Sequence, residues 1–334
     1  MKNSIGVDIG ATKIIFGLLK NRKVIKKKKI PTPKTKKIII KELKENLRDL
    51  KKSSDLKIDR IGIGVPGILD IKKGLILKCP NLRYLDNLPL VKILEKELKI
   101  KTSIENDTNC FTLAEALFGA GKNKNIVFGI TLGSGVGGGL VIRTCLSSQR
   151  SCSLRAARQN LDSVHSEAVH CELLKYKSNN LELKDKNKIK IYRGAFGTAG
   201  EIGHQTIKFD GQKCSCGNLG CFEYYCSAKF FKRKGYSAKE LTEKAKRNNR
   251  KALRIFKEYG KYLGIGLSNI INLIEPEIIV VGGGISKSWP YFLAETKKEI
   301  KKRIISPVSK KYTKVEISKL GDLAGSIGAG LIND

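Results

Sequence analysis

The 334-residue chain contains no apolar run that reaches the roughly 18 residues a membrane-spanning helix needs. Its first residues, MKNSIGVDIG, also lack the basic segment followed by an apolar segment that marks a secretory signal peptide. These absences argue against a membrane span and against export. We therefore expect a cytoplasmic protein with no membrane partner.

Acidic residues and arginine are both scarce, whereas lysine is abundant. The chain has 31 Asp and Glu against 65 Lys and Arg, a formal net charge of +34, and lysine outnumbers arginine 51 to 14. Clustered cations would favour nucleic acid through counterion release. The lysines are spread along the whole chain, however, and arginine is the better bidentate reader of phosphate. We therefore expect no specific nucleic-acid partner.

The number of cysteines is not even, as a full set of disulfides would require. The chain has nine cysteines, an odd number, and no export signal accompanies them. This count argues against a disulfide framework and favours free thiols or metal ligands.

The N-terminal part alternates short apolar segments with tight turns. Ser4–Gly10 and Lys13–Lys20 are predicted to be strands joined by a glycine-containing turn, and a third strand follows at Val24–Ile30. Residues 34–52 have helical spacing, and Arg60–Val65 is predicted to be a buried strand. This order indicates a mixed sheet in an α/β domain.

The same plan recurs further along the chain. Ile126–Leu132 is a predicted strand, Gly133–Gly139 a glycine-rich turn, and Leu140–Ile142 the start of a partner strand. Arg254–Leu273 is a predicted long apolar helix, and the strand Ile278–Val281 ends in three glycines. The repetition suggests a duplicated α/β domain with a cleft between its halves.

Residues 143–188 do not fit this plan. A hairpin loop normally has roughly two to five residues, but this segment separates Ile142 from an apparent continuation of the sheet at Ile189–Tyr192. Residues 143–174 contain no lysine but four arginines, three cysteines and two of the three histidines. We interpret 143–188 as an atypical insertion.

The insertion contains Cys152, His165 and His170, which match part of a zinc-finger spacing. The nearest earlier cysteine, Cys145, is too distant to complete that spacing. We therefore expect no second metal site there.

Two glycine-containing turns have the composition of phosphate-binding loops. In Asp8-Ile9-Gly10-Ala11-Thr12-Lys13, backbone N–H groups and the Thr12 hydroxyl can hold phosphate oxygens, and Asp8 is placed to hold magnesium directly or through water. The second turn lies in Thr131–Gly139, whose G-x-G-x-G spacing differs from the dinucleotide fingerprint and from the P-loop. Together they predict a nucleotide held in a cleft.

Asp107 follows a predicted strand, in the sequence Glu105-Asn106-Asp107-Thr108-Asn109. One interpretation is a helix N-cap, because Asp107 stands where the strand ends and a helix running to Gly119 begins. The other is a general base that takes the proton from a sugar hydroxyl, since phosphoryl transfer needs a carboxylate to orient the nucleophile. Beside two phosphate-binding turns, the second interpretation is favoured.

The most specific signal is a group of metal-ligand residues. One histidine and three cysteines lie within 18 residues of one another: His204, Cys214, Cys216 and Cys221. Such a set can close the tetrahedral site of a structural zinc. Reduced cysteines in a loop are the alternative, but four ligand-type residues this close favour a metal. Glu201 and Glu223 flank the group and can accept hydrogen bonds from sugar hydroxyls.

The motifs DIGATK, ENDTN, LGSGVGGG, GEIGH, C-x-C-G-x₂-G-C and VVGGG, in this order, resemble those of the ROK family (repressors, open reading frames and kinases). The resemblance covers nearly the whole chain apart from 143–188. It implies an α/β protein with the two-domain actin-like ATPase (ribonuclease H-like) fold, an interdomain cleft and a zinc-binding loop. The implied domains are a small one at 1–106, rejoined by a C-terminal helix at 321–334, and a large one at 107–320.

The resemblance also implies a role for each matching residue. Asp107 matches the catalytic base, and the zinc ligands match His204, Cys214, Cys216 and Cys221. The sugar-hydroxyl contacts match Gly67, Asn106, Glu201, His204 and Glu223. The phosphate loops match Asp8, Gly10, Ala11, Thr12 and Lys13, and Thr131, Gly133, Ser134, Gly135 and Gly137; the adenosine-side turn matches Gly282, Gly283 and Gly284. ATP, Mg²⁺ and Zn²⁺ are the implied ligands.

We accordingly expect an ATP-dependent hexose kinase that phosphorylates a sugar 6-hydroxyl, with glucose as the leading substrate and a homodimer or homotetramer as the assembly. N-acetylmannosamine and fructose are alternative substrates. A sugar-responsive transcriptional regulator is a second class, although only seven residues precede Asp8, too few for the added DNA-binding domain. An inactive sugar-binding protein, disabled by the insertion, is a third.

Overall fold

The structure is a computed structural model that describes residues 3–54, 56–144 and 188–332. Two compact units divide the chain, one formed by residues 1–141 and 191–334 and the other by residues 142–190. All the candidate site residues belong to the first unit. Most of the predicted insertion, with Cys152, His165 and His170, lies outside the described residues.

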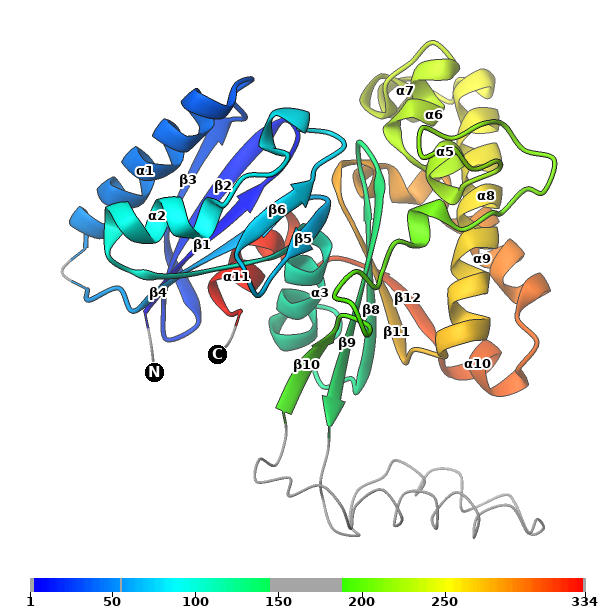
Figure 1. Cartoon of the computed structure of the whole chain (residues 1–334). Coiled ribbons are helices and arrows are strands. Elements are labelled where there is room, and N and C mark those ends of the chain that lie inside the picture. The colour runs from blue at the N-terminus through cyan, green and yellow to red at the C-terminus, as the bar shows by residue number, and fades with distance from the viewer. Residues whose placement is uncertain (1–2, 55, 145–187, 333–334) are drawn as a thin grey trace, which may run out of the picture. The chain divides into compact units, whose positions relative to one another are not determined.

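The first sheet has five strands in the order β3-β2-β1-β4-β7 (Figure 1). These are β1 (Ser4–Ile9), β2 (Lys13–Lys20), β3 (Lys23–Pro31), β4 (Arg60–Val65) and β7 (Lys101–Asn106). Strand β2 pairs antiparallel with β1 and β3, whereas β1, β4 and β7 run parallel. The mixed sheet predicted from the order of strands and helix is confirmed.

Strand β3 forms an edge of this sheet and carries the exposed lysine run Lys26–Lys29. Lys28 of this run pairs with Asp49 of helix α1 (Lys36–Lys52), with 3.3 Å between Nζ and Oδ2. Charged side chains at a sheet edge discourage pairing with a further strand. Part of the excess of lysine therefore lies where solvent can hydrate it.

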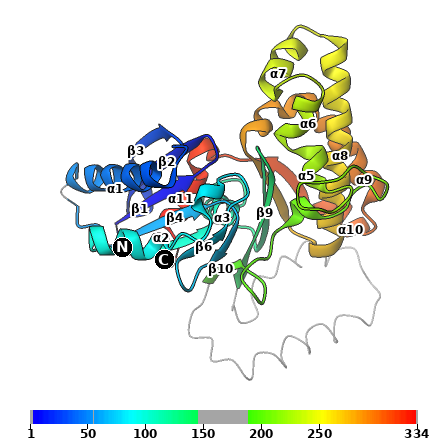
Figure 2. The same cartoon turned by 45° about the horizontal axis from the view of Figure 1, so that its top comes forward.

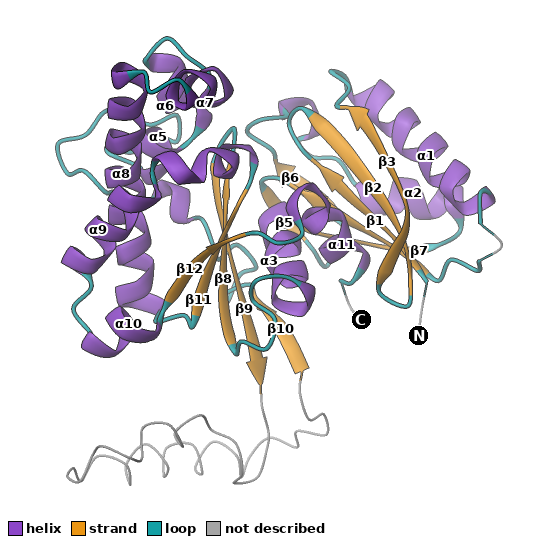
Figure 3. Ribbon diagram, turned by 180° about the vertical axis from the view of Figure 1, so that it is seen from behind, coloured by secondary structure: helices purple, strands orange, loops and turns teal. Residues whose placement is uncertain are grey.

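Helices cover both faces of the first sheet (Figures 1 and 3). Side chains alternate across a strand, so Val7 and Ile63 lie on the face where they form one core with apolar residues of α1 and α2 (Leu90–Leu98). Gly6 and Gly62 lie on the other face, where α11 (Ala324–Gly330) packs directly on the strand backbones. The C-terminal helix thus returns to the N-terminal sheet.

The second sheet has the matching strand order β10-β9-β8-β11-β12. Its strands are β8 (Ile126–Leu132), β9 (Val136–Thr144), β10 (Lys188–Tyr192), β11 (Ile278–Gly282) and β12 (Lys314–Ile317). Strand β11 runs parallel to both β8 and β12. Helix α3 (Asp107–Phe118) packs against β8 on one side, and α8 (Arg250–Ile274) with α9 (Leu293–Arg303) lies on the other (Figure 3).

The remaining elements connect these layers. Strands β5 (Ile68–Asp70) and β6 (Leu75–Lys78) form a small sheet after β4. Helices α5 (Phe222–Cys226) and α7 (Ala238–Lys246) contact α8, with α6 (Ala228–Arg233) between them in the sequence (Figure 2). The short helices are η1 (Arg83–Leu85), η3 (Ile202–His204), η4 (Gly284–Tyr291), η5 (Gly321–Leu323) and α10 (Pro307–Tyr312). None of the helices in the described ranges combines the length and apolarity needed to cross a bilayer.

One expectation from the sequence is wrong. The turn predicted at Gly133–Gly139 is shorter, because β9 already begins at Val136. The later glycines are strand residues that allow α3 to approach, since a Cβ on Gly137 would lie 2.1 Å from Thr108 Oγ1. The domain boundaries at 106 and 320 stay predictions.

The Gly62→Ala variant is expected to lose at least about 1–3 kcal/mol of unfolding free energy, because overpacking forces backbone shifts. A Cβ on Gly62 would lie 1.7 Å from the carbonyl oxygen of Ala329 in α11. Urea denaturation measures the difference. Gly284→Ala is the matched control, since its Cβ would meet nothing within 4 Å. Equal stabilities of Gly62→Ala and the unsubstituted protein would contradict this packing.

Candidate active site

The predicted residues of the first sheet gather at one edge. Strands β1, β4 and β7 are parallel, so their carboxyl ends meet at the same edge. The turn Gly10–Lys13 follows β1, Gly67 follows β4, and Asp107 follows β7 directly. In open α/β sheets ligands bind outside the carboxyl ends of the strands. The topology therefore places these predicted residues together.

The second sheet repeats this arrangement. Strands β8 and β11 are parallel, with Gly282 opposite Thr131. Their carboxyl ends lead into the turn at 133–135 and into Gly283 and Gly284. A Cβ on Gly283 would lie 2.3 Å from the carbonyl oxygen of Leu132, so the two turns are in contact. The predicted phosphate loop and the predicted adenosine-side turn form one surface.

Each glycine turn retains backbone donors that the fold does not use. Gly10 N–H donates to the carbonyl of Lys13 at 2.9 Å, and Gly133 N–H donates to that of Gly135 at 3.0 Å. Within the described residues, the N–H groups of Ala11, Thr12 and Ser134 form no hydrogen bond with other groups of the chain. Consecutive free N–H groups of this kind bind anions.

The helix-cap role considered for Asp107 belongs to Asn106. The side-chain oxygen of Asn106 accepts from Thr108 N–H at 2.9 Å and Asn109 N–H at 3.2 Å. Its amide nitrogen contacts the carbonyl of Gly67 at 3.5 Å. Asp107 is the first residue of α3, and its Oδ1 accepts from the backbone N–H of Thr108 at 2.7 Å. Its carboxylate is thus not needed to cap the helix.

A short chain of hydrogen bonds links Asp107 to the second glycine turn. The hydroxyl of Thr108 lies 3.3 Å from Asp107 Oδ1 and 2.8 Å from the hydroxyl of Thr131. Thr131 is the last but one residue of β8, directly before the turn at 133–135. The first turn of α3 therefore connects the two sheets at their functional edges.

Asp8 and Asp107 interact electrostatically across this edge. The pKa of Asp8 is raised to about 7, first by burial and next by the nearby Asp107, while Lys13 opposes the shift. Burial also raises the pKa of Asp107 to about 6, although hydrogen bonds from Thr108 lower it. A buried carboxylate whose pKa is raised by a neighbouring carboxylate suits a bound cation, and one whose pKa lies near neutrality suits a proton-accepting role.

Lys13 is held by an acidic residue near the C-terminus. Its Nζ lies 2.5 Å from Asp322 Oδ2, and Lys287 Nζ lies 3.9 Å from Asp322 Oδ1. The hydrogen bond from Lys13 lowers the pKa of Asp322. Asp322 thus joins a lysine of the first glycine turn to one of η4, a link that the sequence alone did not indicate.

A second unpredicted pair lies beside Asp107. Glu105 is fully buried, and its Oε2 accepts from Arg193 Nε at 2.7 Å. The residues are 88 positions apart, so no local motif joins them. The one hint in the sequence was that an arginine stands at position 193 of a lysine-rich chain. Arginine is the better partner for a buried carboxylate, so it could have indicated an ion pair.

A pocket lies next to these groups. It is lined by Gly67–Leu69 and Ile71, by Glu105, Asn106 and Asn109, and by Gly197–Ala199 and Glu201. Residues 197–201 follow β10 of the second sheet, whereas the other lining residues follow or belong to strands and helix α3 next to the first sheet. The pocket is therefore lined from both sheets. Burial raises the pKa of Glu201, an effect opposed by His204 and reinforced by Glu223.

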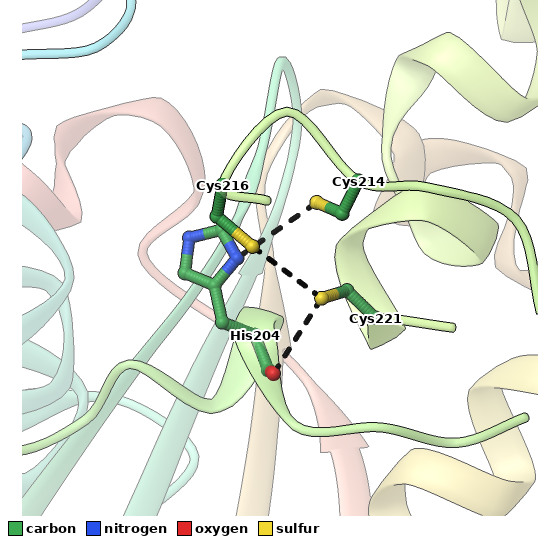
Figure 4. Close-up of side chains that lie close together, drawn as sticks. All are labelled: His204, Cys214, Cys216 and Cys221. Atoms are coloured by element: carbon green, nitrogen blue, oxygen red, sulfur yellow. Dashed lines mark hydrogen bonds between the residues drawn. The ribbon is translucent and has the colours of Figure 1, made fainter. Parts of the chain in front are cut away.

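His204, Cys214, Cys216 and Cys221 converge as the spacing predicts (Figure 4). Their ligand atoms all lie within 4.8 Å of one another. Cys216 Sγ is 3.6 Å from Cys221 Sγ, and Cys214 Sγ is 4.0 Å from His204 Nδ1. Tetrahedral zinc with Zn–S bonds of about 2.3 Å separates its sulfurs by about 3.8 Å. The four residues therefore fit a tetrahedral ion.

Glu223 connects this cluster with the second glycine turn. It is in the first turn of α5, just after Cys221, and its Oε2 accepts from Val136 N–H at 3.0 Å. His204 uses Nδ1 toward the cysteines, which leaves Nε2 for another partner. The predicted metal loop and the predicted phosphate loop are thus one connected structure.

Residues 4–148 and 187–333 match the ROK family. The chain belongs to the ROK family. The part that is left unmatched falls inside the predicted insertion at 143–188.

ROK proteins of two kinds are similar to this chain. The glucokinase of Thermotoga maritima is 28% identical over 352 residues, which cover 98% of this chain and 96% of the glucokinase. The xylose repressor of Bacillus spizizenii is 31% identical over 278 residues, which cover 81% of this chain. The matched part spans only 60% of the repressor's length.

Solved ROK structures are similar over their whole length. The ROK family glucokinase from Streptomyces griseus in complex with glucose and AMPPNP has a TM-score of 0.75 and 27% identity, covering 99% of this chain and 98% of that one. The ROK hexokinase from Thermus thermophilus has a TM-score of 0.73 and 25% identity, covering 98% and 97%. The expected two-domain actin-like ATPase fold is thereby confirmed.

The Thr108→Val variant is expected to raise the pKa of Asp107 above its value of about 6, because it removes a hydroxyl that stabilises the carboxylate. Carboxyl ¹³C NMR titration, assigned with Asp107→Asn, measures the shift. Thr112→Val is the control, since the Thr112 hydroxyl bonds the carbonyl of Thr108 instead. An Asp107 that titrates at its ordinary value of 3.8 would contradict the described burial.

Proposed function

We propose that this ROK protein is an ATP-dependent hexose kinase that transfers a γ-phosphoryl group to a sugar 6-hydroxyl, with glucose as the leading substrate. The observation that carries the proposal is the position of Asp107. Its carboxylate is released from helix capping, has a pKa of about 6, and is linked through Thr108 to a glycine turn with free N–H groups. A base with a pKa near the working pH suits proton abstraction.

The sugar is proposed to bind beside Asp107. Asn106 and Gly67 already contact each other there, and Glu201 lines the same pocket. His204 offers its second ring nitrogen, and Glu223 is fixed by Val136 N–H next to the phosphate turn. Carboxylates, an imidazole and an amide are suited to the donors and acceptors of a polyhydroxy ring.

The nucleotide is proposed to bind along the two glycine turns. Ala11, Thr12 and Ser134 direct N–H groups to phosphate oxygens, while Gly282, Gly283 and Gly284 leave room for the adenosine. Asp8, whose pKa is raised by Asp107, would hold the magnesium ion. That ion supplies neutralisation of phosphate charge, and Asp107 accepts the proton of the attacking hydroxyl.

The named relatives support a sugar kinase and leave the sugar open. They include glucokinases and the N-acetyl-D-glucosamine kinase of Mannheimia succiniciproducens, which is 27% identical over 350 residues. N-acetylmannosamine and fructose remain alternative substrates of the proposed kinase. A cytoplasmic homodimer or homotetramer, without membrane or specific nucleic-acid partners, completes the proposal.

A sugar-responsive regulator is the second candidate function. Its support is the similarity to xylose repressors, at 31% identity for the protein of Bacillus spizizenii. An inactive sugar-binding protein would share the same pocket residues. Turnover separates the kinase from both, because neither alternative transfers a phosphoryl group.

The purified protein is expected to phosphorylate glucose with ATP and Mg²⁺ in a coupled assay, and Asp107→Asn is expected to lower kcat by about 10²–10⁴-fold. The asparagine keeps the size of the side chain but cannot take the proton. Calorimetry should show glucose binding retained in the variant. An absence of turnover across a panel of hexoses, or an active Asp107→Asn protein, would refute the proposal.

The pH profile provides a second readout of the same proposal. Asp107 must be ionised to act as the base, so kcat/KM should rise with pH through about 6 and level off above it. Asp8 ionises at a lower pH when it binds magnesium, because the cation stabilises the carboxylate. A flat profile between pH 5 and 8 would argue against Asp107 as the base.

The Cys/His cluster is proposed to hold one zinc ion that stiffens the segment bearing Glu201 and Glu223. Metal analysis should give about one zinc per chain, since the four ligands complete one tetrahedral site. Cys216→Ser should lose zinc and raise KM for the hexose severalfold, because metal binding orders the loop. Cys226→Ala, which alters a buried cysteine outside the cluster, should retain zinc. A zinc-free protein with unchanged KM would exclude this role.

A further inference from the structure

We propose that the Glu105–Arg193 ion pair is a positioning device that sets Glu201 relative to Asp107 and thereby the sugar hydroxyl relative to its proton acceptor. This inference rests on the proposed kinase function. Within the described residues, no hydrogen bond or ion pair joins either side chain to the proposed phosphate turns. Both act through the elements that bear the sugar-binding groups.

Glu105 is anchored on the Asp107 side of the pocket. It stands in β7, two residues before Asp107, and its side chain has no exposed surface. One oxygen accepts from Asn106 N–H at 2.9 Å and from Asn109 Nδ2 at 3.0 Å, while the other accepts from Arg193 Nε at 2.7 Å. One carboxylate oxygen thus binds the start of α3, and the other binds Arg193.

Arg193 is anchored on the Glu201 side. It follows β10 and begins the segment that leads to Glu201. Its carbonyl accepts from Ala199 N–H at 3.0 Å, which closes residues 193–199 into a compact loop. Gly197–Ala199 and Glu201 line the same pocket as Glu105 and Asn106. A single ion pair therefore ties the two walls of the pocket together.

The chemistry of the Glu105–Arg193 pair explains why it would fix the direction of the 193–201 loop and not only hold the loop in place. A fully buried carboxylate strongly favours a permanently charged partner, and the guanidinium does not lose its proton. Its planar shape fixes the direction of the Nε–H bond, whereas a lysine ammonium is a flexible point charge. Lysine outnumbers arginine 51 to 14, yet arginine occupies this site. Loss of the pair should therefore release the 193–201 loop.

The test compares Glu105→Gln and Arg193→Gln with a matched control elsewhere in the fold. In the control pair, Arg303 Nε lies 2.9 Å from Glu299 Oε2, and the two side chains are 39% and 6% exposed. The corresponding values for Arg193 and Glu105 are 35% and 0%. Arg303→Gln therefore breaks an ion pair of the same type away from the pocket.

Both pocket variants are expected to raise KM for the hexose and lower kcat, by about ten- to a hundredfold in kcat/KM, because small misplacements of reacting groups are costly. KM for ATP should stay within about twofold, since the nucleotide turns are anchored by other residues. Arg193→Lys should restore part of the loss. Arg303→Gln should leave all three constants unchanged. Equal changes in the ATP and hexose constants, or none, would overturn the proposal.

Hydrogen exchange supplies a readout that does not depend on turnover. Amides of residues 194–201 should exchange faster in both pocket variants and not in Arg303→Gln. If the unsubstituted protein phosphorylates no hexose, the kinase proposal fails. The pair is then judged by loop exchange and by the Kd for glucose. Unchanged exchange in the pocket variants, or faster exchange with unaltered hexose constants, would refute positioning by this pair.

Discussion

Helix α3 packs closely between the two sheets, and this packing determines where its first turn lies. Its side chains fill spaces left by glycines of β8 and β9, and Cys110 packs against the C-terminal helix α11. The Thr108 and Thr131 hydroxyls then lock the helix start to the second sheet. Asp107 is fixed by this packing rather than by its own contacts. The other groups proposed to bind the sugar must lie at the right distance from Asp107, so its position determines the geometry of the proposed site.

Packing against α11 also contributes to the raised pKa of Asp8. Burial against α11 keeps water from Asp8, and the carboxylate of Asp107 lies close enough to disfavour a second negative charge. Carboxyl groups with raised pKa values are common at functional sites, where a bound ligand can neutralise their charge. The nucleotide turns, the paired carboxylates and the C-terminal helix are therefore one electrostatic unit. Asp322, which holds Lys13, extends that unit toward η4.

Much of this architecture could be predicted from local sequence. Short apolar segments bounded by turns located β1, β2 and β4, and the spacing of His204 with the three cysteines located the cluster. The glycines after Val136 misled the prediction, because glycine serves both turns and close strand–helix packing. The Asn106 cap was missed because Asn and Asp are equally good caps. The Glu105–Arg193 pair depends on tertiary structure, which no local spacing encodes.

Strand β3 has a consequence for how this chain meets other copies of itself. Its row of ammonium groups lies along one of the two edges of the first sheet, where a further strand would have to pair with β3. An identical chain approaching there would present the same row, and the mutual repulsion would grow as ionic strength falls. Charge alone therefore disfavours the addition of a strand at the β3 edge. Dilute salt should make this barrier higher rather than lower.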